Sequence, residues 1–351
     1  MRSPASVAYL VDPRFPGGTS SAVAFELREC TKLGHVSVHA IESQMFSSRT
    51  VAPQLAETLS ALGLELIWDS RTISADVVIL HNPTFLKFQA TLESRILARH
   101  LIVVAHENFL RPGAAESFDV NRCLNQIDRA SLALRKTIAP ISKVNRKTVL
   151  DWLKGNDLRG NWAVLESDWF NICAFPMIAP NTTPADRRGR HSRPGFEKFP
   201  NLADMDLCFP AHAEANVILG ADHYLADRLR RPHWSMHPFQ SFEVPVFFGM
   251  IDFMVYFTAP TWRESFGRVL AEAIAAGKVV ISDPQTAATF DGGVVAGTPA
   301  QVDEIISGFI ADPKSYHMHV AAAQAKLSPF SAQAFRAHLS RILTQAIGAT
   351  A

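Results

Sequence analysis

The chain has 351 residues, of which 48% are hydrophobic and 19% are charged, and its formal net charge is +1. This length exceeds the size at which one hydrophobic core usually stops growing, so two folded domains are expected, and the apolar content excludes a disordered chain. The small net charge, without a cluster of Lys and Arg interleaved with aromatic residues, argues against nucleic acid as a partner.

The cysteines and the N-terminus predict a cytoplasmic protein. The four cysteines are widely spaced, and no Cys-x-x-Cys pair indicates a zinc site or a disulfide framework. The N-terminal apolar run is too short for a signal peptide, and the most apolar segment, 244–260, falls short of the roughly 20 residues that span a bilayer. We therefore expect membrane contact to be peripheral at most.

Short apolar runs alternate with helical patterns through the first half of the chain. Strands are predicted at 5–11, 36–41, 64–68, 76–80, 101–105, 137–142 and 162–166. Helical patterns occur between them, for example at 20–33 and 85–99. This alternation predicts a parallel sheet that is covered by helices on both faces.

Two glycines, Gly17 and Gly18, follow the first predicted strand and precede a run of Thr and Ser. The pattern is typical of a glycine turn with a Ser/Thr cap at a helix N-terminus. Such a turn could approach phosphate groups, although a plain tight turn fits the local sequence equally well. The segment is not Gly-x-Gly-x-x-Gly, so it does not favour a dinucleotide-dependent dehydrogenase.

Polar residues also follow later strands, where side chains line the ligand site of such folds. His106 stands just past the strand at 101–105, and His81 occupies the same place after the strand at 76–80. A single His is more often structural than catalytic, so both functions stay open. The loop at 109–116, which contains Arg111, is predicted to contact an acceptor.

A Pro- and Arg-rich segment, 176–194, precedes a second series of strands. They are predicted at 216–219, 234–237, 252–257, 279–282 and 293–296. The predicted fold is α/β, with two Rossmann-like, doubly wound domains that face a cleft. The predicted boundaries are 1–178, 179–330 and a C-terminal helix at 331–351.

The most informative segment is Glu264-Ser-Phe-Gly-Arg-Val-Leu-Ala-Glu272, which follows the strand at 252–257 and opens a helix. Free N–H groups and the positive end of the helix dipole favour a diphosphate at this position. The residues expected beneath that diphosphate are Ser265, Phe266 and Gly267. Glu264 would face the sugar hydroxyls, and Glu272 could reach the ribose. For an arbitrary pair of glutamates, two solvated charges are the alternative.

This Glu-x7-Glu pattern, followed by Ala-Ile-Ala-Ala-Gly-Lys-Val-Val-Ile, resembles the signature of retaining GT-B-fold glycosyltransferases of the group 1 or family 4 type. The resemblance is strongest across 186–297. The chain departs from the family at Arg268, where the family has an apolar residue, and at Lys278-Val279, where it has Pro-Val. Neither departure removes a predicted ligand.

The resemblance implies further donor-binding residues. Gly189-Arg190 and Lys198 resemble the family's Gly-Arg…Lys loop, whose cations neutralise the donor diphosphate. Arg193 is a competing cation, and an exposed basic loop is the plain alternative. The family's apolar strand before Gly-Arg is replaced by Thr-Thr-Pro-Ala-Asp-Arg-Arg, so the first strand of the second domain is not predicted.

The resemblance also implies roles in the N-terminal domain. The Gly17-Gly18 loop would face the donor, and His106 would lie near the reacting sugar. His81 ranks second and could instead line the acceptor pocket. Asp204-Met-Asp206 matches the metal-binding Asp-x-Asp of a different fold only superficially, because it follows no strong strand, so no metal is expected.

The predicted function is the transfer of a sugar from a nucleotide-diphosphate sugar to an acceptor hydroxyl, with retention of configuration and without metal or cofactor. The catalytic candidates are His106 and Glu264. A glycan, a lipid-linked molecule or a small molecule could be the acceptor. The alternatives are a nucleotide-sugar epimerase or inverting transferase on the same fold, and a catalytically silent subunit that binds a nucleotide sugar.

Overall fold

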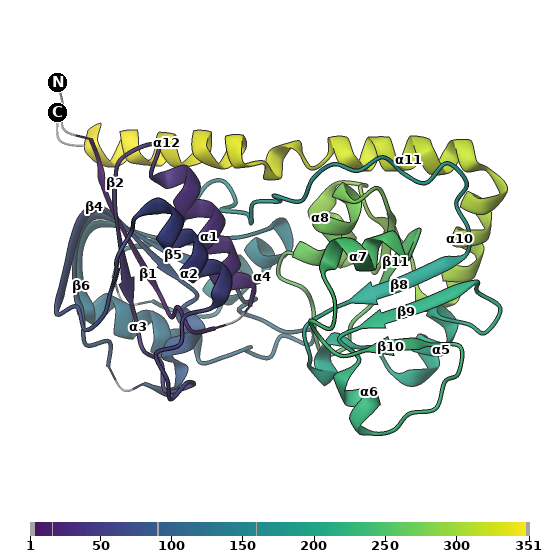
Figure 1. Ribbon diagram of the computed structural model, residues 1–351. Coiled ribbons are helices and arrows are strands. Elements are labelled where there is room, and N and C mark those ends of the chain that lie inside the picture. Colours follow the sequence, from purple (N-terminus) through teal and green to yellow (C-terminus); the bar gives the residue numbers. More distant parts are fainter. Residues whose placement is uncertain (1–3, 16, 90, 159, 349–351) are drawn as a thin grey trace. The chain divides into compact units, whose positions relative to one another are not determined.

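The computed structural model describes residues 4–15, 17–89, 91–158 and 160–348 and divides the chain into two compact units (Figure 1). The first unit comprises Met1–Ile172 and Phe330–Ala351, and the second comprises Cys173–Pro329. The first three residues of the predicted first domain and the last three of the predicted C-terminal helix lie outside the described residues.

The first unit contains a parallel sheet in the order β3-β2-β1-β4-β5-β6-β7. Its strands are β1 Ser6–Val11, β2 His35–Ala40, β3 Leu66–Ile67, β4 Thr72–His81, β5 Arg95–Ala105, β6 Ser131–Pro140 and β7 Trp162–Val164. Its helices are α1 Gly18–Cys30, α2 Pro53–Leu62, η1 Pro83–Phe88, α3 Val120–Ala130, α4 Lys143–Lys154 and α12 Ala332–Gly348.

Helices cover the first sheet, so its central strands are buried on both faces. Strand β1 has Ala8, Tyr9 and Leu10 with no exposed surface, which explains its continuous apolar run. The last helix, α12, runs beside α1 (Figure 1). Phe335 of α12 is fully buried and packs against Trp169, with the ring centroids 5.4 Å apart.

The predicted helix at 85–99 is wrong. The chain forms the short 3-10 helix η1 and then the strand β5 from Arg95. Both β4 and β6 pair with the first half of β5, at residues such as Ile96 and Leu97. Backbone pairing on both sides of β5 therefore outweighs the local helical spacing of its apolar residues.

The second unit contains a parallel sheet in the order β10-β9-β8-β11-β12-β13. Its strands are β8 Arg187–His191, β9 Ala215–Leu219, β10 Ser235–His237, β11 Phe253–Tyr256, β12 Val279–Ser282 and β13 Val295–Ala296. Its α-helices are α5 Leu202–Cys208, α6 Asp222–Ala226, α7 Val244–Gly249, α8 Arg268–Ala275, α9 Pro284–Ala287, α10 Val302–Ala311 and α11 Pro313–Ala325. The 3-10 helices are η2 Phe196–Lys198, η3 Ala288–Phe290 and η4 Pro299–Gln301, and η5 Ser328–Phe330 leads into α12.

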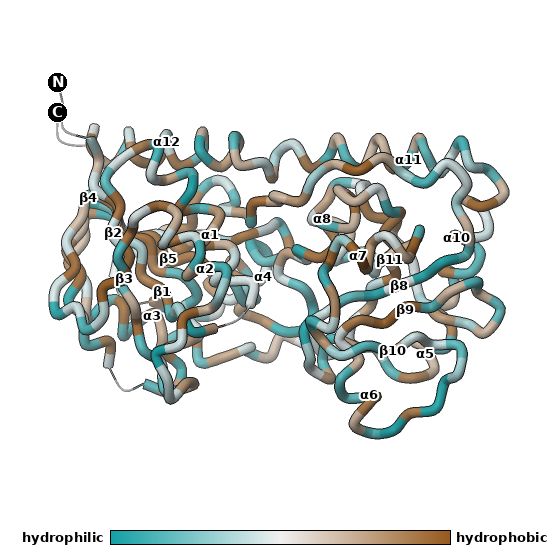
Figure 2. Tube along the Cα trace, in the orientation of Figure 1, coloured by the Kyte–Doolittle hydropathy of each residue, from teal (hydrophilic) through white to brown (hydrophobic). Residues whose placement is uncertain are grey.

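Strand β8 is central in the sheet although its sequence is Arg-Arg-Gly-Arg-His. Figure 2 shows this hydrophilic strand beside the hydrophobic β9. The fully buried Arg188 donates hydrogen bonds to Asp186 at 2.6 Å, to Asp303 at 2.6 Å and to the Cys208 carbonyl at 3.1 Å. Paired charges thus replace apolar contacts at this position, which a search for apolar runs does not detect.

Each sheet has one place where the strand order reverses. It lies between β1 and β4 in the first unit and between β8 and β11 in the second. In open parallel sheets, ligands bind at such switch points, beyond the carboxyl ends of the strands. Among the described helices, none combines the length and apolar character that would let it cross a bilayer.

Candidate functional site

The switch point of the second unit brings Lys198, Tyr256 and Glu264 together. Lys198 ends η2 after β8, Tyr256 ends β11, and Glu264 precedes α8. The Lys198 ammonium lies 2.6 Å from Oε1 of Glu264, and the Tyr256 hydroxyl donates to the same oxygen at 2.6 Å. The side chains of Lys198 and Glu264 are only 10% and 14% exposed. The contact joins residues 66 positions apart in the sequence.

The environment of Glu264 favours its ionised form. Burial by itself would raise the pKa of Glu264. The charge of Lys198 and the hydrogen bonds from Lys198 and Tyr256 outweigh burial, so the pKa of Glu264 lies below its ordinary value. Burial, together with the nearby carboxylate, raises the pKa of Tyr256, which keeps its hydroxyl a donor. The site therefore presents a carboxylate at neutral pH.

Arg190 supports this cluster from inside the sheet. It lies in β8 with 1% of its surface exposed. Its guanidinium donates to the backbone carbonyl of Phe257 at 3.0 Å and to that of Lys198. Its Cζ atom lies 4.0 Å from the ring centroid of Phe199 and 5.1 Å from that of Tyr256. The sequence predicted a direct contact with the diphosphate, whereas in the structure Arg190 holds the backbone of the two segments that carry Lys198 and Tyr256.

Gly267 caps the helix that begins beside this cluster. Helix α8 begins at Arg268, and Gly267 has φ +83°, in the left-handed region that favours glycine. Phe266 is buried, with its ring centroid 5.8 Å from that of Phe290, and Ser265 is half-buried. The first N–H groups of a helix have no intrahelical acceptor, so the start of α8 offers donors to an anion.

Glu272 is partly engaged by a neighbour on the same helix. Arg268 donates to Glu272 Oε1 at 2.9 Å, and the two side chains are 25% and 17% exposed. Arg268 is the residue at which the chain departs from the family pattern. Arg193, the competing cation, is more exposed and lies 3.5 Å from Glu197.

In the first unit, His106 and His81 lie at the carboxyl ends of neighbouring strands. His106 follows β5 and is half-buried, whereas His81 ends β4 and has no exposed surface. His81 Nδ1 lies 2.9 Å from His106 Nε2, and His81 Nε2 lies 3.3 Å from Glu26 Oε2. Burial, followed by the effect of His81, lowers the pKa of His106 well below its ordinary value. The prediction that His81 lines an acceptor pocket is wrong, because a fully buried ring lies behind His106.

The glycine turn after β1 differs from the prediction. Gly17 occupies the N-cap position of α1, and the helix begins at Gly18. Because the N-cap residue is a glycine, it has no side chain that could cap the helix. The hydroxyl of Ser20 donates to the carbonyl of Phe15 at 2.6 Å instead of capping the helix. The predicted Ser/Thr cap is therefore wrong. A Cβ on Gly17 would lie 2.3 Å from the Phe15 ring, so a larger residue at this position would require the Phe15 side chain to move.

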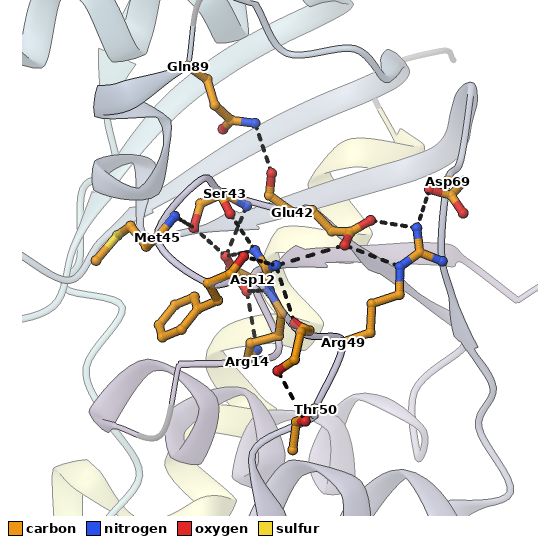
Figure 3. Close-up of polar contacts among 11 residues, drawn as sticks. Asp12, Arg14, Glu42, Ser43, Met45, Arg49, Thr50, Asp69 and Gln89 are labelled. Atoms are coloured by element: carbon orange, nitrogen blue, oxygen red, sulfur yellow. Dashed lines mark hydrogen bonds and ion pairs between the residues drawn. The ribbon is translucent and has the colours of Figure 1, made fainter.

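A pocket lies at the switch point of the first unit. It is lined by Asp12, Phe15, Thr19, Ser43, Met45, Phe46, Asn82, Thr84, Phe85, Lys87 and Glu107. Figure 3 shows the ion pair beneath it: Arg14 donates to both oxygens of Asp12 at 2.8 Å and to the Ser43 carbonyl at 2.7 Å. Burial would raise the pKa of Asp12, but the hydrogen bonds from Arg14 and Ser43 outweigh it and lower the pKa. The pocket thus combines aromatic walls with fixed polar groups.

Figure 3 also shows a surface extension of this network, in which Arg49 lies 2.6 Å from Glu42 and 2.7 Å from Asp69. Arg111, predicted on the acceptor side, lies in an exposed loop, and its backbone N–H donates to the Ala115 carbonyl at 2.8 Å.

One group of metal-type ligands is found among the described residues: Asp186, His212 and Asp303, whose ligand atoms lie within 4.8 Å of one another. Arg188 lies 2.6 Å from each of the two carboxylates, and His212 lies 2.8 Å from Asp303. These contacts explain, without invoking a metal ion, why the three side chains lie close together.

Comparison with known proteins gives the fold. No protein-family model matches the sequence, and no curated protein matches it significantly. The crystal structure of HepE from Anabaena in complex with UDP and glucose is similar over 97% of this chain and 100% of its own, with a TM-score of 0.67 and 14% identity. A glycosyltransferase from Rickettsia africae is similar over 99% of each chain, with a TM-score of 0.61 and 13% identity. An α-glucosyltransferase in complex with UDP-glucose and DNA is similar over 98% of this chain and 100% of its own, with a TM-score of 0.57 and 11% identity.

The chain has the GT-B fold.

The sequence did not predict several residues that lie at or near the switch points of the two sheets. Tyr256 stands in an apolar run that was predicted only as a strand, and Glu26 lies in the middle of a helix without a recognisable motif. Asp12 follows the first strand directly, which is the signal that could have identified it. Arg14 could have been found only with its partner, because its role depends on the pairing.

Proposed function

We propose that this protein is a glycosyltransferase that moves a sugar from a nucleotide-diphosphate sugar to an acceptor hydroxyl. The observation that carries the proposal is the Glu264 carboxylate, which Lys198 and Tyr256 hold at the switch point beside the start of α8. A carboxylate accepts hydrogen bonds from sugar hydroxyls, and the adjacent ammonium matches the charge of a diphosphate. The shared fold of neighbours that were crystallised with UDP or UDP-glucose supports this reading.

In this proposal the donor lies over the second unit. The diphosphate binds the first N–H groups of α8 across Ser265, Phe266 and Gly267, with Lys198 as the cation. Glu264 orients the sugar. Glu272 binds the ribose through Oε2, because Arg268 donates to its other oxygen, Oε1. Arg193 and the Gly17-Gly18 turn are further donor contacts. Arg190 acts as a positioning residue, because its Nη1 and Nη2 atoms donate to backbone carbonyls.

We further propose retention of configuration by attack on the same face. The bond between the anomeric carbon and the phosphate oxygen breaks, and its electron pair stays on the phosphate. The acceptor oxygen forms the new bond on that face and gives its proton to a phosphate oxygen. His106 holds the acceptor hydroxyl. No metal or cofactor takes part, since Lys198 and the start of α8 stabilise the leaving group.

A second candidate is an inverting transferase, and the environment of His106 favours it. Its lowered pKa keeps His106 neutral at physiological pH, so its ring could accept the proton of the acceptor hydroxyl. In that case attack would come from the opposite face, and the product would have the inverted configuration.

The acceptor is proposed to bind the first unit, in the pocket that Phe15, Phe46 and Phe85 line, with Arg111 as a further proposed contact. Aromatic walls with a few polar groups are typical of ligand sites. The proposed acceptor is a glycan, a lipid-linked sugar or a small molecule, of which this pocket, with a volume of about 40 Å³, would hold only a part. One structural neighbour was crystallised with DNA. The net charge of +1 gives this chain little electrostatic attraction for nucleic acid. We propose a cytoplasmic location with peripheral membrane contact at most.

The test is turnover in a metal-free buffer that contains EDTA. The protein is incubated with UDP-, GDP-, ADP- or dTDP-sugars and a panel of acceptors, and nucleoside diphosphate release and product configuration are followed by NMR. Retention is expected, with turnover lost in Glu264→Gln and kept in Glu304→Gln, which changes an exposed residue of α10. Inversion would select the second candidate. Nucleotide-sugar binding without any turnover would contradict the proposal and indicate a catalytically silent subunit.

A further inference from the structure

A chain of buried polar groups extends behind His106 in the first unit. Trp169 donates from Nε1 to Glu26 Oε1 at 3.0 Å. The other carboxylate oxygen, Oε2, lies 3.3 Å from His81 Nε2, and His81 Nδ1 lies 2.9 Å from His106 Nε2. Glu26 and His81 have no exposed surface. Within the described residues, Glu26 Oε2 and His81 Nε2 have no other hydrogen-bond partner.

The surroundings hold the His81 ring in one plane. Tyr9 stacks on it, with the ring centroids 5.6 Å apart and an interplanar angle of 10°. Trp169 meets the same ring edge-on, with the centroids 6.5 Å apart. Rotation of the ring would break both contacts in a tightly packed interior. The two nitrogens of His81 are therefore fixed in opposite directions, one toward Glu26 and the other toward His106.

The hydrogen atoms along this chain can be assigned from its acceptors. Trp169 Nε1–H donates to one carboxylate oxygen of Glu26, and the other oxygen faces His81 Nε2, so an accepting carboxylate places the proton of His81 on Nε2. A His81 ring that carries its single proton on Nε2 accepts at Nδ1. His106 must in turn carry its proton on Nε2 to donate to it. This leaves His106 Nδ1 unprotonated, with its lone pair available.

We propose that Glu26 and His81 are positioning residues that fix the tautomer of His106, so that His106 Nδ1 accepts a hydrogen bond from the acceptor hydroxyl. This inference rests on the proposed function for the identity of the hydroxyl, and specifically on its second, inverting candidate, in which His106 takes the proton of that hydroxyl. With Nδ1 as acceptor, the hydroxyl directs its hydrogen at His106 and keeps an oxygen lone pair for the anomeric carbon. In the opposite tautomer, Nδ1–H would donate to that oxygen and could not take its proton.

Glu26→Gln tests this inference because it keeps the shape of the side chain. The amide oxygen can still accept from Trp169, while the amide N–H₂ now faces His81 Nε2 and forces it to accept. His81 then carries its proton on Nδ1 and donates to His106 Nε2, so the proton of His106 moves to Nδ1. The substitution therefore inverts both tautomers without a loss of packing.

The first readout is the ¹⁵N NMR spectrum of the histidine rings in the protein without substrate, assigned with His106→Asn. The wild type should show His106 protonated on Nε2, and Glu26→Gln should show it protonated on Nδ1. The second readout is kinetic: kcat should fall by at least about tenfold with the KM of the donor unchanged, since a wrong tautomer in a protease triad lowers kcat by about 10⁴. A merely structural role of Glu26 would move neither the tautomer nor kcat selectively.

Two further variants complete the test. In His81→Gln, the amide oxygen can accept from His106 and the amide N–H₂ can donate to Glu26, so the wild-type tautomer and most of kcat should remain. Glu29→Gln changes a buried carboxylate one turn away on α1 that pairs with Lys32, and it should leave the His106 signals unchanged. Protonation of wild-type His106 on Nδ1, or an unchanged tautomer in Glu26→Gln, would overturn the inference. The NMR result does not require turnover, so it is decisive even if the proposed activity fails.

Discussion

Replacing Lys198 by Met leaves Glu264 as a buried carboxylate without its cation. The two charges are 2.6 Å apart, and their side chains are 10% and 14% exposed. At an effective dielectric constant of about 20, unit charges at that distance attract by about 6 kcal/mol, and desolvation offsets part of this. The hydrogen bond from Tyr256 remains. Removal of one partner of a buried pair typically costs about 3 to 5 kcal/mol, and with Tyr256 retained we expect about 3 kcal/mol at pH 7.

The pH dependence of this effect has a defined sign. In the wild type, the pKa of Glu264 lies below its ordinary value of 4.5, so the pair stabilises the fold above that pH. This stabilisation is lost as the pH falls through the lowered pKa of the folded state. In Lys198→Met, burial acts without the opposing charge, so the pKa of Glu264 rises above 4.5 and ionised Glu264 destabilises the fold. The difference between wild type and variant should therefore be largest at neutral pH and shrink on acidification.

The assay is urea denaturation of wild type and Lys198→Met between pH 4 and pH 8. The double variant Lys198→Met/Glu264→Gln should recover most of the lost stability, because it removes the unpaired charge. The control is Lys147→Met, which removes a lysine whose side chain is 76% exposed from its pair with Asp151 and should change stability little. The reasoning is refuted if Lys198→Met behaves like Lys147→Met at pH 7, or if its effect grows on acidification.

Three further outcomes are expected. Gly267→Ala forces φ +83° on a residue with a side chain, so it should lower the free energy of unfolding by about 1 to 2 kcal/mol and weaken nucleotide-sugar binding. The control Gly308→Ala lies in a helix and has no atom near its added Cβ, so it should not destabilise the protein. Calorimetry tests both variants. Arg14→Lys loses the fork that binds one carboxylate and three carbonyls and should cost about 2 to 3 kcal/mol of stability in urea denaturation. The matched change Arg49→Lys, at a half-exposed arginine, should change stability little, and equal effects of the two variants would contradict this. Because the pKa of His106 is well below 6.5, kcat/KM should show no His106-dependent loss near pH 6.5; a loss there that disappears in His106→Asn would contradict the assignment.

The strands show how far the sequence predicts this fold. Continuous apolar runs identified β1 and β9, because strands buried on both faces carry such runs. The arginine-rich β8 was missed, since its burial depends on Asp186, Asp303 and aromatic rings contributed by other segments. The segment at 95–99 was assigned to a helix because its pairing with two neighbouring strands is not visible in local spacing.

The candidate site was predictable to a similar extent. The position of Glu264 after a strand and before a helix is local information, so it could be recognised. Its contact with Lys198 spans 66 residues and follows from the adjacency of β8 and β11, which is a property of the sheet order. The buried chain from Glu26 through His81 to His106 joins one helix and two strand ends, and nothing in the sequence marks Glu26 as its partner.

The measurement that tests the central claim most directly is thermal stabilisation by nucleotide sugars in the absence of metal. A ligand at 100 times its dissociation constant should stabilise the fold by about 2.7 kcal/mol. We expect one of the UDP-, GDP-, ADP- and dTDP-sugars to stabilise the wild type, and Glu264→Ala and Lys198→Ala to lose that response. A response to none of these donors, or a response that both variants keep, would contradict a donor site at Glu264 and Lys198.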